Sequence, residues 1–400
     1  MNLSFSTYTE DISFILADPV TIESIPAGCK AEVPITSALF DLNERIGNDM
    51  EQNCSYTLSD LPTTAVTVLQ QQVRDAVKVW GYDKKVDFKK KPLTALLDAR
   101  RLLDLGMGQG PWGAAMLSNP KLNLEYYVGL DPAVCPPIHA RTRDMKVKRK
   151  GKQLQCQKAY GTTNTTDPRV LSCTGGLAKY HPFPVNGLEM MAAYPGQVAL
   201  LPGTFETLHS KLSKVVFDAV LVKTVTEHLE HLHSVFEGLW ELLGHCSSHA
   251  TIVIDHHNYY SYDGHHGYPQ SSEQLNENPP PEMLELADWG HINPEASVAA
   301  DRTLNRVRPG DLQALLNVYF DCECMQSPIP KIDEKRFDSA MESRLSKLGF
   351  ARHEFMAKHI YFQCNRRAEP LKPELVQTMI LHHPPMDGSY RAQPFHCKSA

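Results

Sequence analysis

The chain has 400 residues, of which 42% are hydrophobic, 8% aromatic and 22% charged, and its formal net charge is -6. This composition is typical of a globular protein and excludes a disordered or fibrous chain. The negative charge argues against a surface built throughout for nucleic acid or anionic membrane. No run approaches the roughly 18 apolar residues of a membrane span. Acids stand at Glu10 and Asp11, where a targeting peptide would be basic. We therefore expect a soluble, cytoplasmic protein.

The ten cysteines are scattered along the chain and form no Cys-x-x-Cys pair. This spacing argues against a zinc ribbon or a thioredoxin-type redox motif. Because no targeting peptide is visible, we expect reduced thiols, most of them small core residues.

Apolar periodicity predicts an amphipathic helix over 63–82. A strand at 102–105, a glycine-rich turn, a helix at 112–117 and a strand at 126–130 then form a strand-helix-strand unit, which is typical of a parallel sheet. Further strands are predicted at 198–201, 217–222, 251–254, 319–325 and 359–362, and further helices at 227–243, 309–318 and 334–355. The sequence thus predicts an α/β fold with a doubly wound, mostly parallel sheet.

This pattern predicts three parts of the chain. Residues 1–94 are expected to form an N-terminal extension and helical cap, 95–367 the α/β domain, and 368–400 an irregular tail. Two segments, 135–196 and 264–308, are long insertions between strands, which are uncommon unless they bind something or cap a site. We expect 264–308 and the helix at 334–355 to act as lids that exclude water.

The glycine-rich turn Asp104-Leu105-Gly106-Met107-Gly108-Gln109-Gly110 follows a buried strand and opens a helix, which is the context of a nucleotide-binding turn. Glycines let the backbone approach a ligand closely. Asp131 ends the next strand, where a carboxylate can accept hydrogen bonds from ribose hydroxyls. An acid at Asp104 favours a cationic ligand, S-adenosylmethionine, over NAD.

Four segments resemble the motifs of class I S-adenosylmethionine-dependent methyltransferases in the right order. They are 102–110 (first motif), 128–131 (second motif), 202–208 (third strand) and 217–221 with 227–229 (fourth strand and helix). The resemblance spans about 270 residues. It implies a seven-stranded Rossmann-like sheet of order 3-2-1-4-5-7-6, with the last strand antiparallel.

The resemblance also implies cofactor contacts. It assigns them to Asp104 at the methionine end and to Gly106, Gly108, Gly110 and Asp131. We add Thr204, Phe205 and Lys223, which follow the third and fourth strands. Thr204 departs from the family pattern, because many relatives have an acid there for the adenine amino group. The finer pattern at 304–308 and the Tyr-Tyr-Ser and Gly-His-His runs are similar to bacterial methyltransferases of glycan and small-molecule pathways.

Ten of the 18 histidines lie between residues 228 and 291. Those at 255–266 follow the predicted fifth strand, and ligands of open α/β sheets bind beyond the carboxyl ends of strands. Three interpretations stay open: a histidine is a general base for an acceptor hydroxyl, the side chains bind a metal, or the imidazoles order a long loop. The candidate bases are His228, His256, His257, His265 and His266. The candidate metal ligands are Asp255, His256, His257, Asp263, His265 and His266. A divalent metal is compatible with this segment but not predicted.

Residues 141–158 contain eight basic residues and one acid. They could steer a phosphate-bearing acceptor or form a solvated loop. Nucleic-acid methylation is disfavoured. The Asn/Asp-Pro-Pro-aromatic motif of base-amine methyltransferases is absent from 222–226, and the Pro-Cys nucleophile of cytosine-C5 enzymes occurs nowhere in the chain.

The sequence therefore predicts methyl transfer from S-adenosylmethionine to oxygen, or less readily nitrogen, of a small-molecule or glycan acceptor, without nucleic-acid or membrane partners. A homo-oligomer is allowed. The alternatives are a non-catalytic S-adenosylmethionine-binding regulator or partner subunit, and an NAD-dependent dehydrogenase, which Asp104 disfavours.

Overall fold

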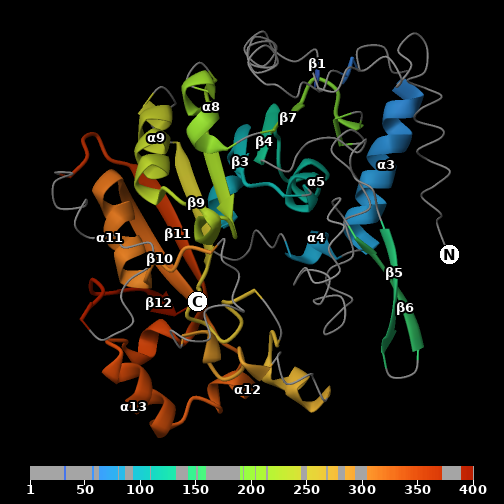
Figure 1. Cartoon of the computed structure of the whole chain (residues 1–400). Coiled ribbons are helices and arrows are strands. Elements are labelled where there is room, and N and C mark those ends of the chain that lie inside the picture. The colour runs from blue at the N-terminus through green and yellow to red at the C-terminus, as the bar shows by residue number, and fades with distance from the viewer. Residues whose placement is uncertain are drawn as a thin grey trace. The chain divides into compact units, whose positions relative to one another are not determined.

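The protein is described by a computed structural model (Figure 1). It describes residues 63–131, 190–292, 304–371 and 389–399, except for gaps at 80, 86–92, 109, 192, 203, 213–214, 245–249, 267–268 and 278–283, together with the short strands 31–32, 56–57, 143–149 and 152–158. The chain divides into two compact units, which we describe separately. The first comprises 1–141, 182–221 and 241–250, and the second 142–181, 222–240 and 251–400.

Eight strands form the main sheet in the order β12-β10-β11-β9-β8-β3-β4-β7. Their bounds are β3 Arg101–Leu105, β4 Tyr126–Asp131, β7 Val198–Pro202, β8 Ala219–Lys223, β9 Thr251–His257, β10 Phe320–Pro328, β11 Ala357–Arg366 and β12 Lys398–Ser399. β11 is antiparallel to both of its neighbours, β9 and β10. When the two-residue β12 is left out and the other seven strands are numbered 1 to 7 in chain order, the order is 3-2-1-4-5-7-6. The last of these seven, β11, is antiparallel. The predicted fold class is confirmed.

In the first unit, β3, β4 and β7 are parallel, and Asp104 lies opposite Gly129 in the β3–β4 register. β3 and β4 are buried over all but one residue each and are mostly apolar, as expected for parallel strands covered on both faces. The helices are α3 (Thr63–Val79), α4 (Tyr82–Lys85), α5 (Pro111–Leu117) and α8 (Phe205–Leu212), with a 3-10 turn η2 (Leu93–Leu96). The predicted helix 63–82 therefore breaks at Gly81, whose φ is 69°.

In the second unit, the helices are α9 (Leu232–Gly244, whose last four residues lie in the first unit), α11 (Pro309–Tyr319), α12 (Lys331–Glu334) and α13 (Ser339–Lys347). Single 3-10 turns are η4 (Thr226–His228), η5 (Ser272–Glu277), η6 (Gly290–Ile292) and η8 (Arg352–Glu354). The predicted helix 227–243 thus begins as a 3-10 turn, which places Glu227 and His228 ahead of α9.

The predicted single helix 334–355 is wrong. Asp338 begins a new helix, because its side chain accepts a hydrogen bond from the Met341 amide at 2.8 Å. Gly349, with φ at 87°, lies just beyond the end of that helix. The segment therefore contains the last residue of α12, the short helix α13 and the 3-10 turn η8.

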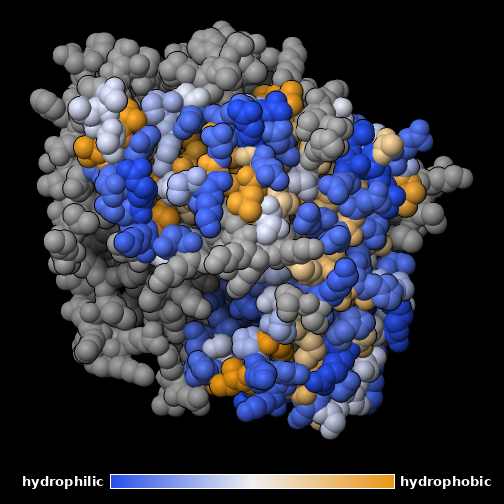
Figure 2. All heavy atoms as spheres, turned by 180° about the vertical axis from the view of Figure 1, so that it is seen from behind, coloured by the Kyte–Doolittle hydropathy of each residue, from blue (hydrophilic) through white to orange (hydrophobic). Residues whose placement is uncertain are grey.

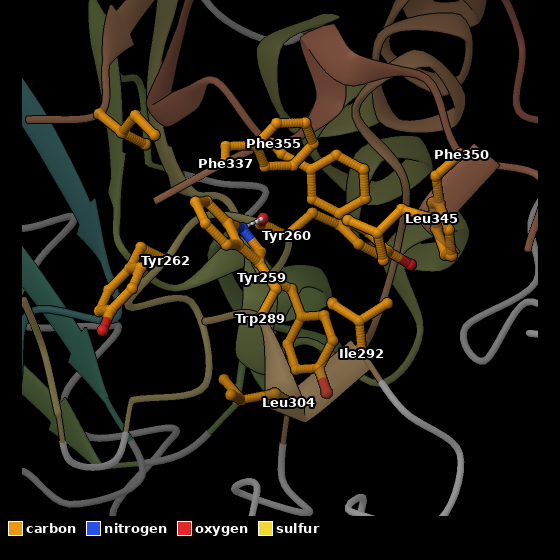
Figure 3. Packing of buried hydrophobic residues seen from close by; sticks show 11 residues of the cluster. Tyr259, Tyr260, Tyr262, Trp289, Ile292, Leu304, Phe337, Leu345, Phe350 and Phe355 are labelled. Carbon is orange, nitrogen blue, oxygen red and sulfur yellow. Dashed lines mark hydrogen bonds between the residues drawn. The ribbon is translucent and has the colours of Figure 1, made fainter. Parts of the chain in front are cut away.

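An aromatic core holds the loop that follows β9 (Figure 3). Its members are Tyr259, Tyr260, Tyr262, Trp289, Ile292, Leu304, Ile329, Phe337, Leu345, Phe350 and Phe355, all buried. The Trp289 indole donates a hydrogen bond to the Tyr260 carbonyl at 3.0 Å. The tyrosines after β9 are therefore packing residues, and they hold the loop formed by residues 258–266 in place.

Four cysteines depart from the predicted reduced state. Disulfides join Cys322 to Cys364 and Cys324 to Cys397. Cys322 and Cys364 are direct partners in the β10–β11 ladder, with their Cα atoms 4.0 Å apart. The prediction of free thiols is wrong at these positions, because a contact between strands leaves no spacing signature in the sequence.

The basic insertion contains a hairpin of β5 (Arg143–Arg149) and β6 (Lys152–Lys158), where a loop was expected. β1 (Ala31–Glu32) and β2 (Tyr56–Thr57) form a short parallel pair. The rest of 1–62, and the rest of the 135–196 insertion up to residue 189, lie outside the described residues.

Large exposed hydrophobic residues are scattered singly over the described surface, at Val68, Leu284, Ile332 and Leu371. Among the coloured residues in Figure 2, hydrophilic ones predominate, with hydrophobic ones between them. Among the described helices, none is long and apolar enough to span a membrane.

Candidate functional site

The glycine turn lies at the carboxyl end of β3 in the first unit. The amides of Gly106 and Met107 donate to the Leu130 carbonyl at 2.6 and 3.2 Å, which ties the turn to β4. Gly108 and Gly110 have φ of 57° and 75°, a region that side-chain-bearing residues rarely adopt. Gly110 is the residue before α5, so the turn leads directly to a helix N-terminus.

Asp131 is held against this turn. Its Oδ2 accepts a hydrogen bond from the Gly108 amide at 2.9 Å. The structure therefore brings together the glycines and the acid that the sequence assigned to one nucleotide site.

Asp104 lies in β3, just before the turn, and is 2% exposed. The Tyr127 hydroxyl donates to its Oδ2 at 2.6 Å. Burial, followed by the charge of Asp104, raises the pKa of Tyr127 well above its ordinary value, so this hydroxyl keeps its proton. A role for Asp104 at the methionine end stays a prediction.

The other predicted cofactor residues differ from one another in exposure and in contacts. Thr204 is exposed, whereas Phe205 is 2% exposed at the start of α8 and lies near the ring of His209. Lys223 ends β8, and its Nζ forms an ion pair with Asp255 in the second unit. The structure thus adds a partner for Lys223 that the sequence did not suggest.

A second cluster of polar side chains lies within the second unit, after β8 and β9. η4 carries Glu227 and His228, β9 ends at His257, and the loop after β9 carries His266. The His257 ring stacks on that of His266 with centroids 4.7 Å apart, and the His228 ring is 5.2 Å from that of His266. Three of the five predicted histidines are therefore neighbours.

The closest pair in this cluster is His257 Nδ1 and His266 Nε2, which are 2.5 Å apart. Glu227 Oε1 lies 3.9 Å from the same His266 nitrogen. Within the described residues, these three side chains form a group whose ligand atoms all lie within 4.8 Å of one another. The predicted metal-ligand set included the two histidines but not Glu227.

Glu227 is 1% exposed, and its Oε1 has no hydrogen-bond partner. Burial, with a smaller contribution from Asp255, raises its pKa to about 8. Asn305 fixes the backbone here. Its amide nitrogen Nδ2 donates to the carbonyls of Thr226 and Leu229 at 2.6 and 2.8 Å, and its main-chain amide donates to the Glu227 carbonyl at 2.7 Å.

Asp255 supports the cluster from one side. It pairs with Lys223, and its Oδ1 lies 2.8 Å from His359 Nδ1. Burial alone would raise the pKa of Asp255, but Lys223 and His359 hold it well below its usual range. His359 stacks on His257 at 5.0 Å. Sequence reasoning missed His359 because it comes from β11, opposite His257 in the antiparallel register.

His256 and His265 lie deeper. His256 is 1% exposed, with Nδ1 2.8 Å from the Thr226 hydroxyl, and burial lowers its pKa to about 3. His265 is fully buried, and burial lowers its pKa to about 4. Both imidazoles are therefore neutral at pH 7.

No protein-family model matches this chain, and no curated protein matches it. Solved structures do. An S-adenosylmethionine-dependent methyltransferase from Archaeoglobus fulgidus is 12% identical, over 75% of this chain and 99% of that one, with a TM-score of 0.35. A cyclopropane-fatty-acyl-phospholipid synthase-like protein from Lactobacillus casei is also 12% identical, over 76% and 94%, with a TM-score of 0.33.

The plantazolicin methyltransferase BamL, solved in complex with a triazolic desmethylPZN analogue and S-adenosylhomocysteine, is 10% identical over 76% of this chain and 99% of its own, with a TM-score of 0.31. Two of these three proteins are methyltransferases, the group whose motifs the sequence resembles. At such identities and TM-scores the likeness assigns neither an activity nor a substrate to this chain. Its fold follows from its own strand order.

Proposed function

We propose that this protein is an S-adenosylmethionine-dependent methyltransferase whose acceptor is an oxygen, or less readily a nitrogen, of a small molecule or glycan. The observation that carries the proposal is the turn after β3, in which Gly108 and Gly110 adopt left-handed backbone angles and the Gly108 amide holds Asp131 at 2.9 Å. This arrangement follows the first strand of a 3-2-1-4-5-7-6 sheet.

The turn and Asp131 suit a nucleoside. The glycines of the turn have no side chain that would keep a ligand from the backbone, and a carboxylate at the end of β4 can accept hydrogen bonds from ribose hydroxyls. The acid at Asp104 favours a donor with cationic sulfonium and amino groups over NAD. S-adenosylmethionine is therefore the proposed donor.

In the transfer step, the acceptor oxygen attacks the methyl carbon. The carbon–sulfur bond breaks with its electron pair remaining on sulfur, which gives S-adenosylhomocysteine, and the acceptor proton passes to an imidazole. Positioning of donor and acceptor supplies most of the catalysis. The proposed bases are His228, His257 and His266, because His228 is exposed and the other two are partly exposed, whereas His256 and His265 are buried.

The test is to incubate the purified full chain with methyl-labelled S-adenosylmethionine and panels of hydroxylated small molecules and oligosaccharides. We expect labelled product and S-adenosylhomocysteine in equal amounts. Asn replacements at His228, His257 and His266 should show which one matters, with turnover about 10²-fold lower and donor affinity unchanged. His353→Asn, an exposed histidine stacked on Phe395, is the matched control.

Unchanged turnover in all three variants would exclude an imidazole base. Donor binding without turnover on any acceptor, but with turnover once a partner protein is added, would favour the regulator or partner-subunit alternative.

A further inference from the structure

The three closest donor atoms of the histidine cluster belong to side chains from different segments. Glu227 comes from η4, His257 from the end of β9 and His266 from the loop after β9. Contacts with other parts of the second unit fix all three segments. Asn305 holds η4, the β9–β11 ladder holds His257, and the aromatic core holds the loop. The fold therefore brings the three donor atoms together, although their residues are not adjacent in the sequence.

We infer that Glu227, His257 and His266 bind a divalent transition-metal ion. Glu227 Oε1 is buried without a hydrogen-bond partner, and it lies 3.9 Å from His266 Nε2. A buried carboxylate oxygen is costly to leave unpaired, and a metal ion would satisfy it.

The spacing fits such an ion after a small adjustment. At ligand distances of about 2.0–2.1 Å, two donors of a tetrahedral zinc ion lie about 3.3 Å apart. The two imidazole nitrogens are 2.5 Å apart, and all three donors lie within 4.8 Å of one another. The required shifts are within the reach of rotations of these side chains.

Two further features are typical of metal sites. His257 Nε2, the nitrogen that would not bind the ion, is buried without a hydrogen-bond partner and lies 3.4 Å from Asp263 Oδ1, so a carboxylate of the kind found in carboxylate–histidine–metal arrangements is nearby. His266 has φ at 55°, an unfavourable angle for a residue with a side chain. Such strain persists mainly where surrounding structure or function requires it.

Two imidazoles and one carboxylate favour zinc, cobalt, iron or manganese over magnesium or calcium, which prefer all-oxygen sites. Three protein ligands leave a coordination position open to an oxygen ligand. An acceptor hydroxyl bound there would lose its proton more readily, and His228 would then be the base, because His257 and His266 would hold the ion. This last role rests on the proposed function, whereas the metal binding itself does not.

The experiment is a Co²⁺ titration of the full chain after removal of metals with EDTA, followed by visible absorption and calorimetry. We expect one Co²⁺ per chain, with d–d bands and no strong thiolate charge-transfer band, and competition by Zn²⁺ but not by Mg²⁺. Glu227→Gln, His257→Asn and His266→Asn should each weaken Co²⁺ binding more than about 100-fold, because even loss of an outer-shell partner costs 10–100-fold. His353→Asn should bind as the wild type does.

Zinc-edge X-ray absorption of the wild-type protein needs no variant. It should report two imidazole nitrogens at the ion. A wild-type chain that binds no Co²⁺ or Zn²⁺, or binds it through sulfur, would overturn the inference and leave the histidine pair as a simple hydrogen bond. S-adenosylmethionine binding is measured on the same samples. Donor binding without metal binding overturns only this inference, and metal binding without donor binding overturns only the proposed function.

Discussion

At the scale of single residues, Gly108 and Gly110 differ in what surrounds them, although both have positive φ. A Cβ at Gly108 would meet nothing within 4 Å, whereas one at Gly110 would lie 2.8 Å from the Met107 methyl carbon. Both positions therefore need a residue that tolerates positive φ. Of the two, only Gly110 also lacks space for a Cβ atom.

This difference predicts unequal costs. Gly108→Ala should lower the free energy of unfolding by about 1–2 kcal/mol, the cost of a left-handed L-residue. Gly110→Ala should cost more, because Met107 must also move. Urea unfolding of both variants measures the difference, and equal losses would contradict the description of the turn.

The candidate site shows which residues a sequence can reveal. Gly106, Gly108, Gly110 and Asp131 could be predicted because the turn and the following strand are local and carry a known spacing. His359 could not be predicted as a neighbour of His257, nor Asn305 as the residue that holds the backbone of 226–229, because the antiparallel register of β11 and the fold of the 304–308 segment bring them there.

At the scale of elements, an ion pair joins the start of β3 to the residue before β8. Arg101 Nε donates to Asp218 Oδ2 at 3.0 Å and Nη2 to Oδ1 at 2.5 Å, and the Arg101 amide also donates to Oδ2 at 3.1 Å. Burial raises the pKa of Asp218, but Arg101 and these hydrogen bonds outweigh it and lower that pKa overall.

Asp218→Asn should therefore lower the free energy of unfolding by about 1 kcal/mol at pH 7, since the pair is partly exposed. The folded-state pKa is depressed, so this stabilisation is present above the unfolded-state value near 3.8 and is lost as pH falls through the folded value. Urea unfolding at pH 7 and at pH 3 should show the two proteins converging at low pH. A difference that grows on acidification would contradict the pairing.

The elements also show which secondary structure could be predicted from the sequence pattern and which could not. The strand pattern predicted the sheet because buried parallel strands are continuous apolar runs. The helix predicted at 334–355 is wrong because the Asp338 cap and the left-handed Gly349 divide the segment.

At the scale of the whole molecule, the Cys324–Cys397 bridge ties the C-terminal segment, including β12, to β10. The Cys322–Cys364 bridge spans 42 residues. By chain entropy, a loop of this size stabilises the folded state by about 4 kcal/mol.

Reduction should therefore lower the urea midpoint, and the Cys322→Ser, Cys364→Ser double variant should lose much of the response. Alkylation without reductant, followed by mass spectrometry, should leave peptides containing these four cysteines unmodified. Ready alkylation of all four, with no effect of reductant on unfolding, would contradict the bridges.

The central claim is that the chain binds S-adenosylmethionine at the glycine turn. It belongs to the whole molecule, because the turn indicates this ligand only together with the order of the strands around it. Isothermal titration with S-adenosylmethionine, S-adenosylhomocysteine and NAD tests it most directly, with Asp131→Ala and the exposed Asp98→Ala as a matched pair. We predict binding of both adenosyl compounds, loss of it in Asp131→Ala alone, and no binding of NAD. Failure of the folded wild-type chain to bind either adenosyl compound would contradict the proposal that it is a methyltransferase.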